Sequence, residues 1–380
     1  MDAPTFDFAA PGRIIFGAGR SAELPGVVAE LGSRPLVVTG SNPGRYADLL
    51  AALDNPAVAP IDGEPTIDMV RAAVEAARQA SADVIVGIGG GAVLDTAKAV
   101  AGLAASNSDV LDHLEVVGQG LPLPEAVLPW VGVPTTAGTG SEMSANAVVA
   151  SPEHGVKASI RGRELLARVA LVDPLLTVDC PSAVTASSGM DALTQCLEAL
   201  VTPMASPLTD GFCREGLRRA ASGLRRAYTD GSDVAARTDM ALCAALSGLA
   251  LANAKLGAVH GFAGPLGGMI GAPHGAICAA LLAATTRVNV RALAERSPGV
   301  SLDRYTEAAE IITGHPDVAG LVDWLDQTRE MLGIPGLGEL GLTQERIDEA
   351  VTKGKAASSM KGNPIELTDS ELTEILRASL

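Results

Sequence analysis

The chain of 380 residues is longer than a single hydrophobic core usually supports, so two domains are expected. Hydrophobic residues make up 47% of it and charged residues 19%, which excludes a disordered or fibrous chain. With 28 Lys and Arg against 44 Asp and Glu, the net charge is -16, so binding to nucleic acid or to an anionic membrane is not expected.

The cysteines and the N-terminal sequence indicate where in the cell the protein is located. The five cysteines are far apart and form no Cys-x-x-Cys pair, which favours free thiols in a reducing compartment over disulfides or a sulfur-ligated zinc. The opening MDAPTFDFAAPGRIIFGAG has acidic residues and an early Pro, whereas a signal peptide needs positive charge followed by an apolar run. No uninterrupted apolar stretch reaches about eighteen residues. We therefore expect a cytoplasmic protein.

The first half of the chain alternates β-branched runs with amphipathic segments. This rhythm is typical of strands and helices around a mostly parallel sheet. Apolar residues at helical spacing predict a helix over residues 66–81. Buried strands are predicted at residues 34–40, 82–91, 127–136 and 167–174.

A glycine-rich turn follows the second predicted strand. The segment IVGIGGGAVLDTAKAVAG runs from a strand into Gly89, Gly90 and Gly91, and a helix begins directly after them. Glycines let the backbone approach a ligand closely, and the free N–H groups of the first helical turn suit a pyrophosphate. The turn is not the G-x-G-x-x-G fingerprint, and a tight turn without a ligand is the alternative. Asp95 and Lys98 are cofactor-binding candidates or, alternatively, solvated surface charges.

A second polar loop, VGVPTTAGTGSEMS, follows the strand predicted at residues 127–136. Hydroxyl groups and small residues at the carboxyl end of a strand suit contacts to phosphate, ribose or a nicotinamide amide. Its candidate residues are Thr135, Thr136, Thr139 and Ser141. Two such loops are a stronger indication of a bound nucleotide than either loop alone.

The pattern changes over residues 179–189, where Pro, Ser and Gly interrupt it. We place the domains at residues 1–184 and 185–380. Ala- and Leu-rich segments such as residues 238–257 dominate the second part, and their composition favours buried helices. The expected fold class is an α/β N-terminal domain with a mostly parallel sheet, followed by an all-α C-terminal domain.

Polar residues in the helical half raise the question of whether this protein binds a metal. The segment GMDALTQCLEAL predicts a helix with Asp191 and Gln195 on one face, because residues four apart in a helix lie one above the other. His260 and His274 are flanked by glycines in a Gly- and Pro-rich stretch, where a side chain can be presented to a ligand.

Together these motifs resemble the iron-containing (group III) alcohol dehydrogenase family over essentially the whole chain. The matching signatures are a Gly-Gly-Gly-x-x-x-Asp-x-x-Lys turn and a Pro-Thr-Thr-x-x-Gly-Ser-Glu loop. They are followed in family order by VALVDP, GMDALTQCLEAL and GAVHGFAGPLGGMIGAPHG. The resemblance implies the dehydroquinate synthase-like fold of these dehydrogenases, with a dinucleotide-binding domain, a cleft between the domains and a homodimer.

The resemblance also implies a divalent metal, Fe²⁺ or Zn²⁺, held by one Asp and three His. Asp191 matches the aspartate, His260 and His274 match two of the histidines, and Gln195 stands where the first histidine belongs. Gly264 departs too, because relatives often have a further His there, near the substrate. One Asp and two His can still bind a metal. A neutral amide is a poorer donor than imidazole, so a metal-bound and a metal-free site both stay open.

The choice between these two states decides the expected chemistry. With metal, the ion acts as a Lewis acid on the substrate oxygen while hydride passes to or from the nicotinamide. Without metal, His260 or His274 has to donate a proton or a hydrogen bond to that oxygen. Asp191 completes the catalytic candidates in either case.

The nucleotide preference is predicted from the turn after the second strand of the resembled fold. Family members that prefer NAD carry an Asp there, which repels a 2′-phosphate. Here Gly40 takes that place, with Ser41, Asn42 and Arg45 nearby, so NADP is favoured over NAD. Lys157 matches a family lysine on the nicotinamide side, and a surface charge is the alternative.

The function implied is an NAD(P)-dependent oxidoreductase that interconverts an aldehyde, ketone or oxo acid with its alcohol. Maleylacetate reductases share the fold and reduce an activated C=C bond. They usually replace the aspartate by Asn and keep the His, whereas this sequence does the reverse. A redox-neutral lyase, cyclase or isomerase is a second alternative, motivated by Gln195 and Gly264. A non-catalytic protein is disfavoured because both nucleotide loops are intact.

Overall fold

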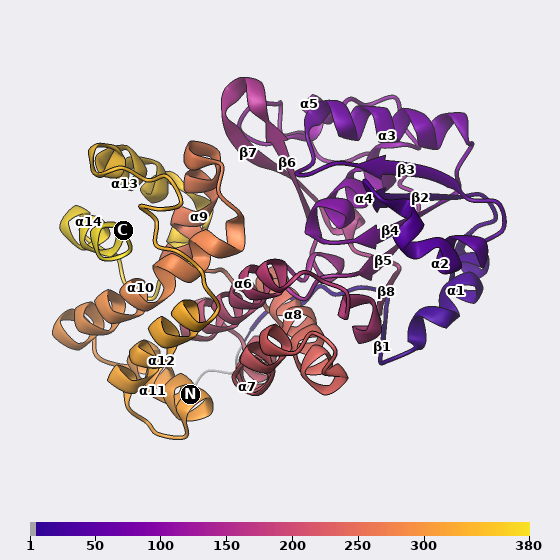
Figure 1. The fold of residues 1–380 in the computed structure, drawn as a ribbon. Coiled ribbons are helices and arrows are strands. Elements are labelled where there is room, and N and C mark those ends of the chain that lie inside the picture. Colours follow the sequence, from indigo (N-terminus) through magenta and orange to yellow (C-terminus); the bar gives the residue numbers. More distant parts are fainter. Residues whose placement is uncertain (1–4) are drawn as a thin grey trace. The chain divides into compact units, whose positions relative to one another are not determined.

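The computed structural model describes residues 5–380, and the chain folds into two compact units (Figure 1). Residues 9–136 and 140–178 form one of them, which we call the α/β unit. The other, the helical unit, contains residues 179–380, the short segment 137–139 and residues 5–8.

A parallel sheet of six strands lies at the centre of the α/β unit, as described for residues 9–178. Its strand order is β1-β8-β5-β4-β2-β3, and every neighbouring pair is parallel. The strands are β1 Arg13–Phe16, β2 Pro35–Gly40, β3 Ala57–Ile61, β4 Val84–Gly89, β5 Trp130–Pro134 and β8 Val169–Val172. The predicted parallel sheet is therefore confirmed, and each of the four predicted ranges contains one observed strand.

The two strands that the sequence pattern missed lie at the two edges of the sheet. β1 is a run of only four residues, RIIF, and is too short for a clear period. β3 contains Pro60, which has no backbone N–H and is therefore confined to edge strands. Short or proline-containing edge strands carry a weaker pattern than buried central ones.

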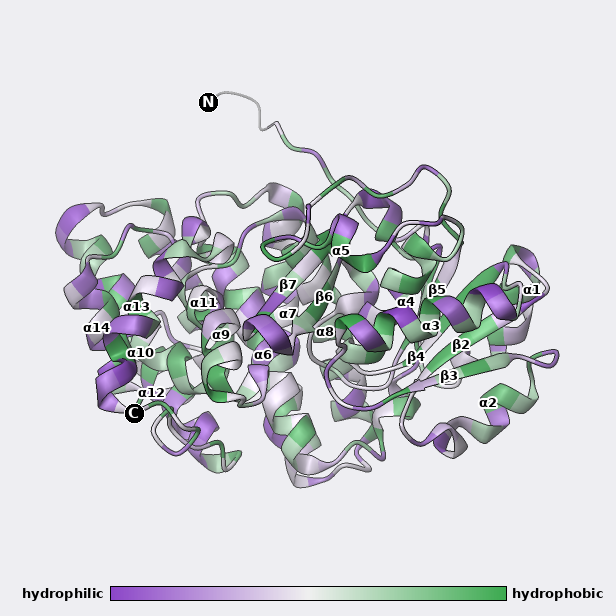
Figure 2. Cartoon of the chain, turned by 90° about the horizontal axis from the view of Figure 1, so that it is seen from above, coloured by the Kyte–Doolittle hydropathy of each residue, from purple (hydrophilic) through white to green (hydrophobic). Residues whose placement is uncertain are grey.

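Helices cover both faces of the sheet. On one face, α1 (Leu24–Leu31) and α2 (Ala47–Ala51) pack over a core that includes Val37 of β2. On the other, α3 (Ile67–Gln79) and α4 (Gly91–Leu103) pack over a core that includes Leu36. Successive strand residues point to opposite faces, so a run of apolar residues serves both cores. Figure 2 shows the central strands in the green of hydrophobic residues.

A two-stranded antiparallel hairpin completes the α/β unit, together with the short α5 (Val110–His113). Its strands are β6 (Asn146–Ser151) and β7 (Val156–Arg161). The connecting turn ends at Gly155, whose φ of 61° lies in the left-handed region that glycine adopts without strain. No pattern in the sequence predicted this hairpin.

The helical unit confirms the predicted all-α C-terminal part. α6 packs against α7 and α8 on the one hand and against α10 on the other, and α10 also contacts α9, α11, α12 and α14. Asp191 and Gln195 lie on α6, as predicted for that segment. The helices are α6 Ser182–Val201, α7 Pro207–Thr229, α8 Val234–Asn253, α9 Ala258–Ile270, α10 His274–Arg296, α11 Val300–Thr313, α12 Val318–Met331, α13 Ile347–Ala356 and α14 Asp369–Ala378.

Two helices in the described part of the chain, α8 and α10, are long and apolar enough to cross a membrane by length and composition alone. In their most apolar windows, however, 61% and 83% of the residues are buried inside the structure. A core helix of a globular protein has the same properties, so these helices are weak evidence for a membrane span.

Candidate active site

The predicted glycine turn joins β4 to α4 through Gly90. A Cβ atom at Gly89 would lie 2.5 Å from a methyl carbon of Val93, which is closer than nonbonded carbons approach. A Cβ atom at Gly90 would lie 3.3 Å from the Thr136 side chain. Glycine is therefore needed at position 89, and no side chain of the glycine turn covers the backbone N–H groups at the start of α4. Such free N–H groups at a helix N-terminus suit a phosphate.

The turns after β2, β4 and β5 lie at one edge of the sheet, because these strands are parallel neighbours. The N–H of Thr135 donates to the carbonyl oxygen of Gly89 at 3.0 Å. β2 leads to α2 on one face and β4 leads to α4 on the other, so the chain reverses its winding here. Open α/β sheets bind ligands at such a switch point. Gly40 is the last residue of β2, and Ser41 and Asn42 follow it at this same edge.

Asp95, Lys98 and Ser141, three predicted cofactor contacts, are joined in a buried network. The Lys98 side chain is 0% exposed, so the alternative of a solvated surface charge is wrong for it. Its Nζ lies 3.2 Å from Asp95 Oδ1 and donates to Ser144 Oγ and to the Asn146 carbonyl oxygen. Ser141 Oγ donates to Asp95 Oδ1 at 2.6 Å. Burial lowers the pKa of Lys98, against the opposing effect of the Asp95 charge.

The remaining residues predicted to contact a nucleotide differ in their neighbours within the protein. Thr135 Oγ1 accepts a hydrogen bond from the Tyr46 hydroxyl at 3.0 Å. Lys157 lies on β7 and forms an ion pair with Glu64 at 3.1 Å. Thr139 falls in the segment 137–139, which packs with the helical unit. Contact of these residues with a nucleotide stays a prediction.

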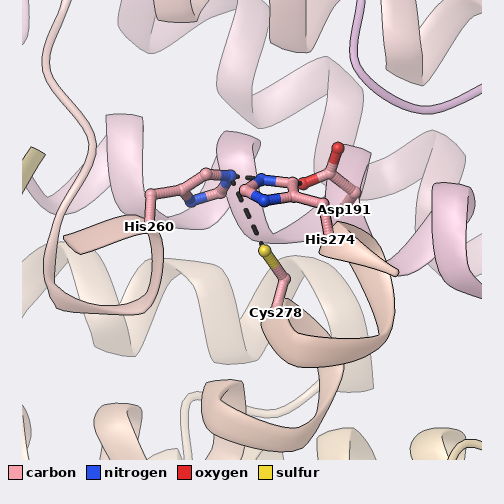
Figure 3. A group of neighbouring side chains, drawn as sticks. All are labelled: Asp191, His260, His274 and Cys278. Carbon is pink, nitrogen blue, oxygen red and sulfur yellow. Dashed lines mark hydrogen bonds and ion pairs between the residues drawn. The ribbon is translucent and has the colours of Figure 1, made fainter. Parts of the chain in front are cut away.

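Three helices of the helical unit bring four metal-ligand side chains together, and we call this group the Asp–His–His–Cys cluster (Figure 3). Asp191 comes from α6, His260 from α9, and His274 and Cys278 from α10. One ligand atom of each lies within 4.8 Å of the other three. Asp191 Oδ1 is 3.2 Å from His260 Nε2 and 3.8 Å from His274 Nε2. The structure thus unites three residues that the sequence analysis singled out and adds Cys278.

Glu198 is a second residue that the sequence analysis missed. Its Oε2 accepts a hydrogen bond from His260 Nδ1 at 2.6 Å, and its Oε1 accepts from the Val259 N–H at 2.7 Å. Helical spacing is the signal that identifies both missed residues. Glu198 is seven residues after Asp191 on α6, and Cys278 is four residues after His274 on α10.

The start of α9 is held so that His260 faces the cluster. Asn363 Oδ1 accepts from the Ala258 N–H at 3.1 Å, next to the bond from Val259 to Glu198. A Cβ atom at Gly257 would lie 2.8 Å from Glu198 Oε1, so this approach of the carboxylate needs glycine. A carboxylate at a helix N-terminus is also favoured by the helix dipole. His260, in the first turn of α9, is thereby fixed in position.

The electrostatics of the cluster favour a positive charge at its centre. Burial would raise the pKa of Asp191, but the hydrogen bond with His260 and the charge of His274 outweigh burial and lower it. Burial would lower the pKa of both histidines. The neighbouring Cys278 sulfur and the Asp191 carboxylate reverse this, so the pKa of His274 is raised and that of His260 is well above its usual value.

Gln195 lies beside the cluster rather than being exposed to solvent. Its Nε2 donates to Asp191 Oδ2 at 3.3 Å, while Asp191 Oδ1 faces the two histidines. Its Oε1 is buried and has no hydrogen-bond partner within residues 5–380. An oxygen, two imidazole nitrogens and a sulfur that converge in this way fit a divalent metal such as Fe²⁺ or Zn²⁺. Gly264 adds no polar group, and a Cβ atom there would meet nothing within 4 Å.

We expect Glu198→Gln to weaken metal binding by roughly 10- to 100-fold, because the carboxylate orients His260 and increases its basicity. The free energy of unfolding should also fall by about 1–3 kcal/mol, because the amide cannot accept all the bonds that the carboxylate accepts. A competition titration between the protein and a chelator measures the first effect, and urea unfolding measures the second. Glu310→Gln, an exposed position on α11, is the matched control. Equal metal affinity in the two variants would contradict this role of Glu198.

Two models of known protein families together match nearly the whole chain. The model of the family described as "Iron-containing alcohol dehydrogenase" matches residues 11–174. The model described as "Fe-containing alcohol dehydrogenase family, C-terminal" matches residues 185–380.

Individual relatives agree with this match. A 4-hydroxybutyrate dehydrogenase of Cupriavidus necator is 32% identical over 91% of this chain and 92% of its own length. A choline dehydrogenase of Bacillus subtilis is 31% identical over 95% of this chain and 92% of its own length. The crystal structure of a sulfoacetaldehyde reductase from Bifidobacterium kashiwanohense in complex with NAD⁺ superposes with a TM-score of 0.90. It has 29% sequence identity and covers 99% of both chains.

Proposed function

The chain belongs to the iron-containing alcohol dehydrogenase family, and on this premise we propose that it is an NAD(P)-dependent oxidoreductase acting on a small carbonyl compound. Its relatives are alcohol and hydroxy-acid dehydrogenases, so carbonyl–alcohol oxidoreduction is the chemistry of the family. The observation that carries the proposal is the Asp–His–His–Cys cluster, in which one ligand atom from each of four side chains lies within 4.8 Å of the other three.

The proposed chemistry needs two bound groups. A divalent metal held by Asp191, His260 and His274 would supply a Lewis acid for the substrate oxygen, and the nicotinamide would supply or accept the hydride. Glu198 accepts a hydrogen bond from the Nδ1–H of His260, so the Nε2 lone pair is left for a metal at the centre of the cluster. Asp191 supplies negative charge at that centre.

His274 is the member of the cluster that solvent reaches. Its side chain is 36% exposed, compared with 7% for His260 and 3% for Asp191. We assign to His274 the side from which the substrate oxygen arrives and from which a proton is exchanged with water. His260 and Asp191, being buried, act as the fixed part of the site.

The proposed substrate is a small aldehyde, ketone or oxo acid. Relatives are named for the oxidation of 4-hydroxybutyrate, choline and 1,3-propanediol, or for the reduction of sulfoacetaldehyde. All of these compounds are short and carry a polar or charged group away from the reacting carbon. A panel of such compounds is therefore the first to test.

The direct test combines nucleotide binding with turnover. NADH and NADPH should each be tried for a rise in melting temperature, and their oxidation followed with the carbonyl panel. We expect binding of at least one nucleotide and turnover of at least one carbonyl. His260→Ala should lose turnover, while His315→Ala, at an exposed position, should retain it. Failure of both nucleotides to bind would overturn the proposal.

The same assay separates the redox-neutral alternative. Gln195 motivates it, because the position of one family ligand has changed. Formation of a product of unchanged oxidation state, with no consumption of nucleotide, would favour a lyase, cyclase or isomerase. Reduction of an activated C=C bond in preference to a carbonyl would favour a maleylacetate reductase-like activity.

We propose NADP rather than NAD as the preferred nucleotide and expect Gly40→Asp to reverse the preference. A Cβ atom at Gly40 would meet nothing within 4 Å, so the carboxylate fits without a clash. It would repel a 2′-phosphate, and the KM for NADPH should rise by at least about tenfold relative to that for NADH. Gly40→Asn, of equal size and no charge, is the control. Similar KM changes in both variants would show that size, not charge, is responsible.

A further inference from the structure

We propose that Cys278 is the fourth ligand of the metal site, in place of the imidazole that Gln195 does not provide, and that the site selects Zn²⁺. The inference deepens the proposed function and rests on its premise that the cluster binds a divalent metal. It also revises the expectation against a sulfur-ligated zinc. That expectation rested on the absence of a Cys-x-x-Cys pair, which bears on sites with several sulfur ligands and not on one Cys among His and Asp.

Cys278 is in the position that a ligand requires. It lies four residues after His274 on α10, so the two side chains lie on one face of the helix. Figure 3 shows both side chains rising from the same stretch of ribbon toward His260 and Asp191. Cys278 Sγ is 3.9 Å from His260 Nε2, and the residue is fully buried. The sulfur therefore faces the other ligand atoms and not solvent.

Three of the distances between the ligand atoms are close to the edge lengths of a tetrahedral site, and all four atoms lie within 4.8 Å of one another. Zinc bonds of about 2.0–2.1 Å to nitrogen or oxygen and about 2.3 Å to sulfur place tetrahedral ligands roughly 3.3–3.6 Å apart. The distances here are 3.2 Å from Asp191 to His260, 3.8 Å from Asp191 to His274 and 3.9 Å from Cys278 to His260. Shifts of a few tenths of an ångström would bring these atoms to bonding positions around one ion. The substrate oxygen would then be a fifth ligand, since zinc sites can expand to five-coordinate during the reaction.

The amide nitrogen of Gln195 binds Asp191 and does not point at the centre of the cluster, where the family's histidine would bind the metal. This nitrogen is engaged with Asp191 Oδ2, the oxygen opposite the one that faces His260 and His274. A neutral amide is also a weaker donor to Fe²⁺ or Zn²⁺ than a thiolate. The role assigned here to Gln195 is to orient the Asp191 carboxylate, while Cys278 completes the ligand set.

Charge balance and ligand softness explain the choice of zinc. The Asp191 carboxylate and a Cys278 thiolate together carry two negative charges, which neutralise a divalent ion in a largely buried site where uncompensated charge is costly. A thiolate is a soft ligand, and sites of mixed nitrogen, oxygen and sulfur bind Zn²⁺ more tightly than Fe²⁺. Exchange of one imidazole for a thiolate therefore moves the preference from iron toward zinc.

The test uses Co²⁺ as a coloured substitute for Zn²⁺. The metal-free full-length protein is titrated with Co²⁺, and a sulfur-to-cobalt charge-transfer band in the near ultraviolet is expected at one equivalent. Cys278→Ala should abolish the band and lower the affinity for Zn²⁺ by at least about tenfold. Cys243→Ala removes another fully buried cysteine of the helical unit and should leave both unchanged. No band in the parent, or a band that persists in Cys278→Ala, overturns the proposal.

A rescue experiment guards against a folding defect of the single variant. Gln195→His in the Cys278→Ala background should regain Co²⁺ binding without the sulfur band, because imidazole then occupies the position of the family ligand. Failure of this double variant to bind while circular dichroism shows it folded would count against the ligand exchange. The band reports on the ligand set and nucleotide turnover reports on the activity. A parent with the band but no turnover therefore refutes the proposed function alone.

Discussion

Asp191→Asn is expected to lower kcat/KM by at least about 100-fold, more than the loss of a residue that only orients a ligand. Asp191 Oδ1 faces both His260 Nε2 and His274 Nε2, and its charge holds up the pKa of both rings after burial has lowered it. An amide keeps the size of the side chain and removes the charge. The cluster then loses its attraction for a cation, while the glycine turn after β4 and the polar loop after β5 are unaltered.

The measurement pairs turnover with metal content after dialysis and with the rise in melting temperature on adding nucleotide. Asp323→Asn, at an exposed position on α12, is the matched control and should behave as the parent. Metal content and turnover of Asp191→Asn within tenfold of the parent would show that the cluster does not depend on this charge. Loss of the nucleotide response as well would indicate a general folding defect.

Glu142→Gln is expected to stabilise the protein above pH 7 by about 3 kcal/mol. Glu142 lies in the short turn η3 (Ser141–Met143) and is 2% exposed. Burial raises its pKa to about 7, although its own backbone N–H and the charge of Lys98 act in the opposite direction. The unfolded chain releases this proton near the ordinary value of 4.5, so the ionised form is less favourable in the folded protein.

The sign of the pH dependence follows from this raised pKa. The contribution of Glu142 to stability is fully present below pH 4.5 and is lost as the pH rises to about 7. Urea unfolding should therefore be measured at intervals from pH 5 to pH 8. As the pH rises, the free energy of unfolding of the parent should fall relative to that of Glu142→Gln. Glu125→Gln, on an exposed loop, should follow the parent. Parallel pH profiles for the parent and Glu142→Gln would contradict a neutral, buried Glu142.

The architecture of the α/β unit was largely predictable, because its strands and turns are specified by residues close to one another in the sequence. Central strands such as β2 and β4 are continuous apolar runs, and glycine at 89 is required by the approach of Val93, four residues away. The hairpin β6–β7 escaped prediction because its stability depends on contacts with distant segments. Lys98 of α4, for example, bonds to the Asn146 carbonyl oxygen.

The burial of charged groups could not be predicted from the sequence. Lys98 lies in a largely apolar helix and Glu142 in a polar loop, and in neither case does the local sequence show that the charged side chain is buried. The tertiary structure buries both, because α4, the loop after β5 and the hairpin close around them. Their altered pKa values are consequences of that packing.

The fold class, the two polar glycine-containing loops and the candidate ligands Asp191, His260 and His274 could be recognised in the sequence, because hydrophobic runs and short motifs carry these features. The contact of Glu198 with His260, and the position of Cys278 beside that ring, follow from the tertiary structure alone. Helical periodicity shows which residues lie on one face of a helix. It does not show which other helix packs against that face. Glu198 and His260 are 62 residues apart in the chain, and packing of α6, α9 and α10 brings them together.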